Sequence, residues 1–288
     1  AKSIKTLGAG DQAWGCTLTV LATGAVMILC YWILFAMTKD YAYHRKPGTS
    51  AAAAPEEKMT VGEMLKQIIV NPPLIGLMMA ELGRFLGRFI IFGLAFYYFK
   101  YVVVSLGSIS TFFTGLTVVA FFGAMASAPL AKKFGERNTY ILSLTLFIIG
   151  LVLVWALPMN SLSFMVVMFL AYLGYGMPDA LSVAMYSATV DYGEWKTGKN
   201  ARGFIMSLIS FPIKTAIFVR SIIITAVLVS AGYVADMAPT PELISGIKAG
   251  IALVPALFIG AGLVIIVLLY RITPQKHREM LEEIAARK

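Results

Sequence analysis

The chain has 288 residues, of which 59% are apolar and 14% charged, whereas an ordinary soluble domain has about 45–50% apolar and about 25% charged residues. The net charge of +9 is typical of a membrane protein with basic cytoplasmic loops, and we expect no nucleic-acid partner. Two cysteines and two histidines exclude a disulfide framework and the usual zinc motifs. Motifs of nucleophilic and nucleotide-dependent enzymes are absent from the sequence, so we predict no enzyme. The composition predicts an all-α polytopic membrane helix bundle with no cofactor and no metal site in this segment.

Seven apolar runs, each long enough to cross a bilayer, follow one another along the chain. They are residues 14–37, 74–98, 106–128, 139–157, 161–190, 203–230 and 249–270. Lysine and arginine are frequent in every second loop and in the C-terminal tail, and scarce in the loops between. By the positive-inside rule, the basic loops and the C-terminus are cytoplasmic. We therefore predict an integral plasma-membrane protein of the bacterial inner-membrane type, with the lipid bilayer as a partner.

The connection between the first two apolar runs differs from the other loops. Thr60 and Glu63 have the spacing of a capping box, which predicts a short helix that ends before Pro72 and Pro73. A short amphipathic helix beside a bundle is expected at a membrane surface. The sequence thus divides into a transmembrane helix (1–38), a cytoplasmic linker with this helix (39–73), a six-helix bundle (74–270) and a cytoplasmic tail (271–288).

Charged residues inside the apolar runs are candidates for a binding site, because each costs about 2.5–3.5 kcal/mol at the centre of a helix. Glu81, Arg84 and Arg88 share one helix face by their spacing, and this face should point into the protein. At about 1.5 Å per residue, Arg84, Asp179 and Lys214 lie at a similar depth near the midplane. We expect these charges to neutralise one another or to line a polar cavity. Ion pairs that only hold helices together are the alternative.

Small residues and a proline accompany these charges in the second and fifth runs: Gly83, Gly87, Gly174, Gly176 and Pro178. Helices interrupted at corresponding positions of two three-span repeats indicate a transporter site. The other interpretation is close helix packing through small residues.

The most specific motif of the chain is Asp191-Tyr-Gly-Glu-Trp-Lys-Thr-Gly198, which is followed by a run that contains Lys214. Weaker motifs lie at residues 71–74, 97–102 and 132–137. On these motifs the chain resembles, over nearly its whole length, the glycoside-pentoside-hexuronide:cation symporters of the major facilitator superfamily, typified by the melibiose permease. The resemblance implies a major facilitator-type C-terminal six-helix bundle preceded by one extra transmembrane helix. These would be helices six to twelve of a twelve-helix transporter, whose N-terminal half is then a partner.

The resemblance implies a secondary active symporter that imports a sugar or glycoside with a cation, Na⁺ or H⁺, by alternating access. Lys214 and Ser210 match family positions near the substrate, whereas Asp179 stands where the melibiose permease has a tryptophan, which argues against melibiose itself. The principal cation-coordinating acids of the family lie in its N-terminal half, so the coupling ion stays open. The substrate-binding residues that we expect in this chain are Asp179, Lys214, Ser210, Glu81, Arg84, Arg88 and Tyr175.

Charged residues of the main motif and just after it, Asp191, Glu194 and Arg202, are expected to form a cytoplasmic gate through changing ion pairs. A solvated loop with helix caps is the alternative for this segment. For the whole chain, the alternatives are a seven-span scaffold or receptor-like protein that transports nothing, and a family member that carries a non-sugar or anionic solute. Arg88 and Arg220 weakly favour an anionic sugar.

Overall fold

The computed structural model describes residues 12–43, 60–235 and 238–287. The chain divides into two compact units, Ala1–Pro55 and Glu56–Lys288. The first unit contains one long helix, α2 (Gln12–Tyr43). Its segment Thr17–Thr38 is apolar and buries none of its residues, as expected for a helix whose side chains face lipid.

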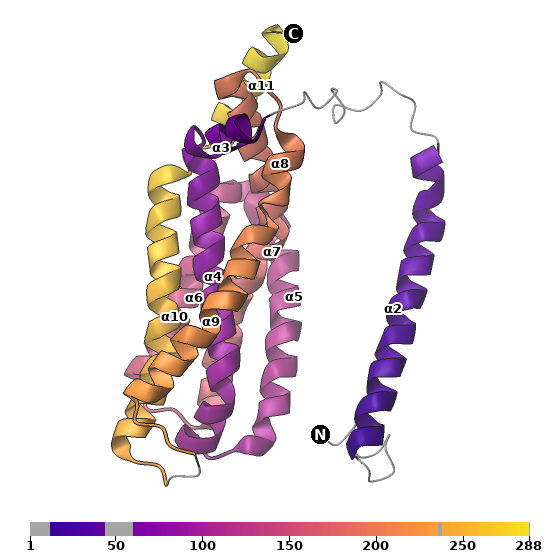
Figure 1. Cartoon of the computed structure of the whole chain (residues 1–288). Coiled ribbons are helices and arrows are strands. Elements are labelled where there is room, and N and C mark those ends of the chain that lie inside the picture. The colour runs from indigo at the N-terminus through magenta and orange to yellow at the C-terminus, as the bar shows by residue number, and fades with distance from the viewer. Residues whose placement is uncertain (1–11, 44–59, 236–237, 288) are drawn as a thin grey trace. The chain divides into compact units, whose positions relative to one another are not determined.

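The second unit is a helical bundle, and its described residues contain no strand. Its long helices run roughly side by side, while α3 and α11 lie at one end of the bundle (Figure 1). A π-helical turn (Tyr98–Val102) and a 3₁₀ turn (Leu106–Ser108) connect α4 to α5. The α-helices are α3 (Val61–Ile69), α4 (Pro72–Tyr97), α5 (Ile109–Phe134), α6 (Glu136–Ala156), α7 (Ser161–Thr197), α8 (Arg202–Ser207), α9 (Ser210–Ser230), α10 (Pro241–Leu269) and α11 (Pro274–Ala286).

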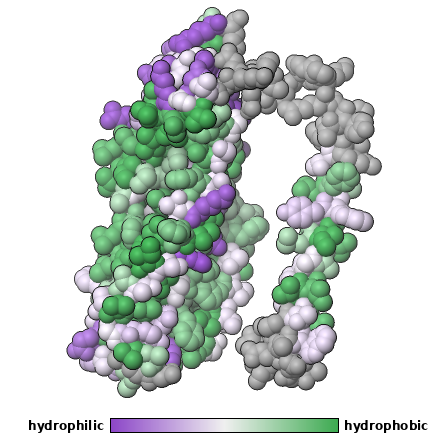
Figure 2. Space-filling view, in the orientation of Figure 1, coloured by the Kyte–Doolittle hydropathy of each residue, from purple (hydrophilic) through white to green (hydrophobic). Residues whose placement is uncertain are grey.

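The surface of the bundle is that of an integral membrane protein. Hydrophobic side chains cover much of the visible length of the bundle, and hydrophilic ones gather at the end that carries α11 (Figure 2). Large apolar side chains such as Phe218 and Leu257 are 76% and 72% exposed. Within the described residues, six helices are long and apolar enough to cross a membrane. The all-α polytopic fold expected from the sequence is therefore confirmed.

The one expected span that is not among these six is the second, which forms α4; this helix is 26 residues long and therefore extends about 39 Å. Three charged residues in its middle make it too polar to count among the six by composition alone. It is nevertheless a central helix, because it packs against both α10 and α9. Many of its side chains, including Leu77, Ile90 and Leu94, are fully buried. Burial among the other helices is what allows a helix with this charge content to lie in the bundle.

Glycines allow the helices to approach closely, most clearly where α5 crosses α7. Gly176 of α7 lies against the carbonyl of Ala120, and Gly123 of α5 lies against the carbonyl of Leu173, so a Cβ atom at either glycine would collide with backbone. Both α4 and α7 are continuous helices, and α7 runs unbroken through Pro178. The prediction that these helices are interrupted is therefore wrong. Helix packing explains these glycines because they occupy the crossing itself.

The segment after the fifth expected span differs from the prediction. The span was expected to end at residue 190, but α7 continues to Thr197 and ends at Gly198, which adopts the left-handed conformation with φ 73°. Most of the motif 191–198 is thus the last two turns of a helix rather than a solvated loop, because the residue that stops the helix is the final glycine. The next expected span, residues 203–230, consists of α8 and α9, and α11 lies within the expected tail.

Candidate functional site

A buried arginine lies at the centre of the charge cluster. Arg84 of α4 is 1% exposed, and its guanidinium pairs with two carboxylates. Its Nη2 lies 2.6 Å from Oε2 of Glu81, one turn earlier on α4, and its Nη1 lies 2.7 Å from Oδ1 of Asp179 on α7. The ion pairs confirm the expected common face of Glu81 and Arg84 and the expected similar depth of Arg84 and Asp179. The expectation that intramembrane charges neutralise one another is therefore met by a three-residue ion-pair network between α4 and α7.

Two hydroxyl groups complete the surroundings of Glu81, which is 3% exposed. Its Oε1 accepts hydrogen bonds from the Tyr140 hydroxyl of α6 at 2.8 Å and from Ser182 Oγ of α7 at 2.5 Å. Both carboxylate oxygens are therefore satisfied, as a buried charge requires. Sequence reasoning missed both residues, although Ser182 lies one turn after Asp179 and this spacing could have indicated it.

The second arginine of α4, Arg88, contacts aromatic side chains directly. Its Nη1 donates to the Tyr175 hydroxyl at 3.3 Å, and its guanidinium lies 5.2 Å from the centre of the Phe92 ring. Among the described residues, Arg88 forms no ion pair. Tyr175 also lies 4.8 Å below the Arg84 guanidinium and is 1% exposed. Its ring therefore supports two arginines and has little free face for stacking on a sugar.

A cavity of about 260 Å³ lies beside this network, between α4, α5 and α7. Asp179 reaches it with a side chain that is 48% exposed. Thr117 adds a hydroxyl group, and apolar and aromatic side chains form most of the remaining wall. The residues that line it are Arg88, Phe92, Leu116, Thr117, Ala120, Phe121, Ala124, Tyr172, Tyr175 and Asp179. The cavity thus offers a cation, a carboxylate and hydroxyls to a polar molecule.

Two of the expected substrate residues are not brought to this cluster. Lys214 and Ser210 lie on α9 and are exposed, and the Ser210 hydroxyl donates to the carbonyl of Ser207 at 3.1 Å. Within the described residues, Lys214 forms no ion pair with Glu81 or Asp179. The physical reason is that α9 fully buries only Pro212 and Ala216, and Lys214 and Ser210 lie on its exposed face.

The expected gate residues form local contacts at the end of α7. Asp191 Oδ2 lies 2.7 Å from His277 Nε2 of α11, and Glu194 accepts a hydrogen bond from Asn200 at 2.7 Å. Arg202 donates to Ser187 Oγ at 3.3 Å. In the part of the chain that the structure describes, the three gate residues do not pair with one another. Their expected role in a gate remains a proposal.

The contact with Asp191 raises the pKa of His277 above its ordinary value of 6.5, mainly through the hydrogen bond, while partial burial opposes the rise. Glu136 also contributes, because its negative charge favours the protonated imidazole. The pair therefore carries opposite charges over a wider pH range than an isolated histidine would allow.

The same motif anchors two helices that lie outside the long bundle helices. On one side, Trp195 Nε1 donates to Glu283 of α11 at 2.7 Å. On the other side, Gln67 of α3 donates to Thr197 Oγ1 at 2.8 Å. A Cβ atom at Gly193 would lie 2.8 Å from Oε1 of Gln67, so this glycine leaves room for α3. The motif thus connects α3, α7 and α11.

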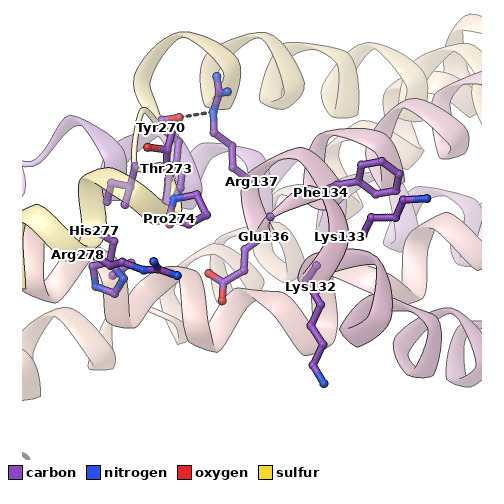
Figure 3. A pocket seen from close by; sticks show the side chains of 14 residues that line it. Lys132, Lys133, Phe134, Glu136, Arg137, Tyr270, Thr273, Pro274, His277 and Arg278 are labelled. Atoms are coloured by element: carbon purple, nitrogen blue, oxygen red, sulfur yellow. Dashed lines mark hydrogen bonds between the residues drawn. The ribbon is translucent and has the colours of Figure 1, made fainter.

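A larger cavity of about 530 Å³ lies at the same end, between the turn from α5 to α6 and the start of α11. Arg137 closes one side by donating to the backbone carbonyls of Tyr270 and Val267. Figure 3 shows Arg137 reaching toward Tyr270, while Lys132 and Lys133 extend away from it. The weak motif at residues 132–137 therefore lines this cavity rather than the one beside Arg84.

Comparison with known proteins identifies the family. The sequence profile of the MFS/sugar transport protein family matches residues 4–274. The chain belongs to this family. It is 31% identical to the glucuronide carrier protein homolog of Escherichia coli over 280 residues, which are 94% of this chain and 57% of the relative. It is 27% identical to the isoprimeverose transporter of Lactiplantibacillus pentosus over 265 residues, which are 91% of this chain and 53% of the relative.

Family membership confirms the predicted resemblance to melibiose permease-like transporters, and these two relatives are named as a carrier and a transporter, not as enzymes. The chain spans a little more than half the length of these two relatives. The bundle accordingly corresponds to part of the fold of these relatives. Sugar transport is the activity that the family description names.

Proposed function

We propose that this chain is the C-terminal part of a secondary active symporter that imports a sugar or glycoside together with Na⁺ or H⁺ by alternating access. In this proposal α2 corresponds to family helix six and the bundle to helices seven to twelve, with the C-terminus in the cytoplasm. The N-terminal half of the same transporter supplies the rest of the site and the main cation site. The observation that carries the proposal is the ion-pair network of Glu81, Arg84 and Asp179 beside a polar cavity.

The chemistry of the cavity suits a sugar. Sugar hydroxyls accept hydrogen bonds from arginine and lysine and donate them to carboxylates, so Arg88 and the exposed part of Asp179 offer complementary partners. The cavity volume of about 260 Å³ is slightly below the roughly 300–1,000 Å³ of ordinary small-molecule pockets. A cavity of this size is consistent with one part of a larger binding site that the two halves of the transporter form together. The exposed Lys214 and Ser210 on α9 belong, in this proposal, to the same shared site.

An uptake assay on the complete transporter tests the proposal. Proteoliposomes with an imposed Na⁺ or H⁺ gradient should accumulate a radiolabelled glycoside, and Lys214→Ala should abolish the accumulation while expression and thermal stability stay unchanged. Normal uptake by this variant would remove Lys214 from the mechanism. Absence of uptake for every sugar and gradient would favour the non-transporting scaffold.

A second candidate substrate class is anionic sugars, and Arg88 is the observation that favours it. Arg88 forms no direct ion pair with a described carboxylate, and one relative is named as a glucuronide carrier homolog. A charge-assisted hydrogen bond contributes about 1.5–3 kcal/mol, so Arg88→Gln should raise the KM for a glucuronide about 10- to 100-fold. Arg88→Lys should restore part of the affinity, and a neutral glycoside should be affected less. Equal loss for both solutes would favour the neutral sugar as the substrate class.

The gate proposal concerns Asp191 and Arg202. Neutralising either residue in the complete transporter should shift the balance between inward-open and outward-open states, because Asp191 connects α7 to α11 and Arg202 lies where α8 begins. The measurement is the labelling rate of single cysteines placed on each side of the membrane. Unchanged rates on both sides would contradict a role in the gate.

A further inference from the structure

The helix α3 packs against the bundle with a mixed face, on which Gln67 and Glu63 lie beside the partly buried Ile68. Gln67 is 1% exposed and binds the end of α7 through Thr197, and Glu63 Oε1 lies 2.7 Å from the Nζ atom of Lys199. A water-soluble protein would bury the apolar side of such a helix. In α3, by contrast, polar side chains contact the bundle and a large part of the apolar side stays exposed.

The other side of α3 carries an exposed apolar stripe, which we define as Val61, Leu65 and Ile69. These residues follow one another at i, i+4 and i+8, and their side chains are 73%, 54% and 75% exposed. In water this arrangement would be unfavourable, because three large apolar side chains stay exposed and lose the stabilisation that their burial would give. The stripe is therefore a surface that requires an apolar neighbour.

The contacts of α3 place it at the level where the bundle leaves the hydrocarbon. The end of α7 carries Tyr192 and Trp195, and Lys196 and Lys276 lie 4.3 and 5.1 Å from the centre of the Trp195 ring. Aromatic rings and lysines of this kind mark the headgroup region of a membrane protein. Because α3 binds Thr197 in the same segment, it lies at the same depth.

The corner between α3 and α4 fixes the direction of the helix. Asn71 is fully buried, caps α4 through the backbone N–H of Leu74 and donates to the carbonyl of Thr189 at 2.7 Å. The capping box expected from the sequence is present at the other end of α3, between Thr60 and Glu63. As a result α3 runs across the end of the bundle rather than along it (Figure 1). This is the direction of a helix that lies in a membrane surface.

We propose that α3 anchors the protein to the lipid bilayer: the stripe Val61, Leu65 and Ile69 enters the boundary between headgroups and acyl chains, and Lys66 and Lys196 bind anionic headgroups. Lipid is favoured over another protein segment by Lys66, which is exposed beside the stripe. Charged residues are depleted at the core of protein interfaces, whereas lysines next to an apolar stripe are typical of helices that bind anionic membranes. The proposal does not depend on which solute is transported.

Spin labels on the protein reconstituted in vesicles test this anchor. Single cysteines replace Leu65, Ile69 or Lys66 in a variant whose other cysteines are serine, and each carries a nitroxide. Labels at 65 and 69 should collide more with oxygen, which concentrates in lipid, than with a water-soluble nickel complex. The label at 66 is the matched control on the same helix, and it should show the reverse preference.

Two results would overturn the proposal. Equal nickel access at all three positions would mean that the stripe faces water, and labels at 65 and 69 that are immobile and shielded from both reagents would mean that protein covers it. The headgroup contact is tested by comparing phosphatidylcholine vesicles with vesicles that also contain phosphatidylglycerol. Anionic lipid should move the labels at 65 and 69 deeper, and Lys196→Gln should reduce this shift. A depth that ignores lipid charge would overturn the headgroup part.

Discussion

Replacing Glu81 by glutamine tests the energetics of the buried network most directly. Gln keeps the shape of the side chain but removes the negative charge that faces Arg84 at 2.6 Å. It also presents an amide to the hydroxyl donors of Tyr140 and Ser182. Removal of one partner from a buried ion pair costs about 3–5 kcal/mol. Because Arg84 keeps its contact with Asp179, we expect a loss near the lower limit.

The matched variant is Asp179→Asn, which removes the other carboxylate of the same arginine. The Asp179 side chain is 48% exposed, whereas that of Glu81 is 3% exposed. Water already screens the Asp179 contact, so its loss should cost only about 1 kcal/mol. For a folded unit of the size of Glu56–Lys288, 1 kcal/mol shifts Tm by about 2–4 °C, so Glu81→Gln should lower Tm by about 6–12 °C and Asp179→Asn by about 2–4 °C.

The assay is thermal unfolding of the purified protein in detergent, followed by tryptophan fluorescence. A double variant, Glu81→Gln with Arg84→Met, separates charge from packing, because it removes the uncompensated cation together with its partner. This double variant should be more stable than Glu81→Gln alone. Equal Tm losses for Glu81→Gln and Asp179→Asn, or no recovery in the double variant, would refute the assignment of Glu81 as the principal counter-ion.

Three further predictions concern other contacts. The pair of His277 and Asp191 stabilises the fold fully below about pH 6.5, and this contribution is lost as the pH rises through the raised pKa of His277. The Tm should therefore fall as the pH rises through this window. If the fall in Tm persists in the His277→Gln variant, the assignment to this pair is contradicted. Gly193→Ala places a Cβ atom 2.8 Å from Oε1 of Gln67, which should displace Gln67 and loosen α3 from the end of α7. The helix α3 should then be cleaved faster by protease, and an unchanged cleavage rate would mean that the contact between Gly193 and Gln67 does not hold α3 in place. Gly176→Ala forces α5 and α7 apart and should lower Tm, and no change would show that the crossing adapts.

The arrangement of the charge cluster was largely predictable from the sequence. The i, i+3 spacing of Glu81 and Arg84 fixes their common face, and equal depth brings Asp179 to the same layer, because rigid spans in a bilayer of fixed thickness make residue counts a measure of height. Tyr140 was not predictable in the same way, and for Ser182 the only signal was its position one turn after Asp179. Hydroxyl residues are common in membrane helices, and placing one in the membrane costs little compared with a charged residue, so composition does not single them out.

Other parts escaped the sequence for different physical reasons. The prediction that α7 is interrupted was wrong because a glycine in a helix can either break the helix or allow close packing. Only the position of the neighbouring helix shows that Gly176 allows close packing. The helix α11 was missed because it is short and polar, and hydropathy detects only helices that bury apolar residues in lipid. Its place is fixed by Met280, which is fully buried, and by the bond between Trp195 and Glu283, both of which are tertiary contacts.

The retention of a buried ion-pair network is itself an argument about function. Well-packed apolar residues of similar volume would be as stable as such a network or more stable, so stability alone does not explain it. Glu81 and Arg84 are sealed on one side by Tyr140 and Ser182, while Asp179 keeps half of its side chain exposed to the cavity. In the proposed function, a polar solute in that cavity would compete with Arg84 for the Asp179 carboxylate. The contact between α4 and α7 would then respond to cavity occupancy, which is the property that a transporter needs and a scaffold does not.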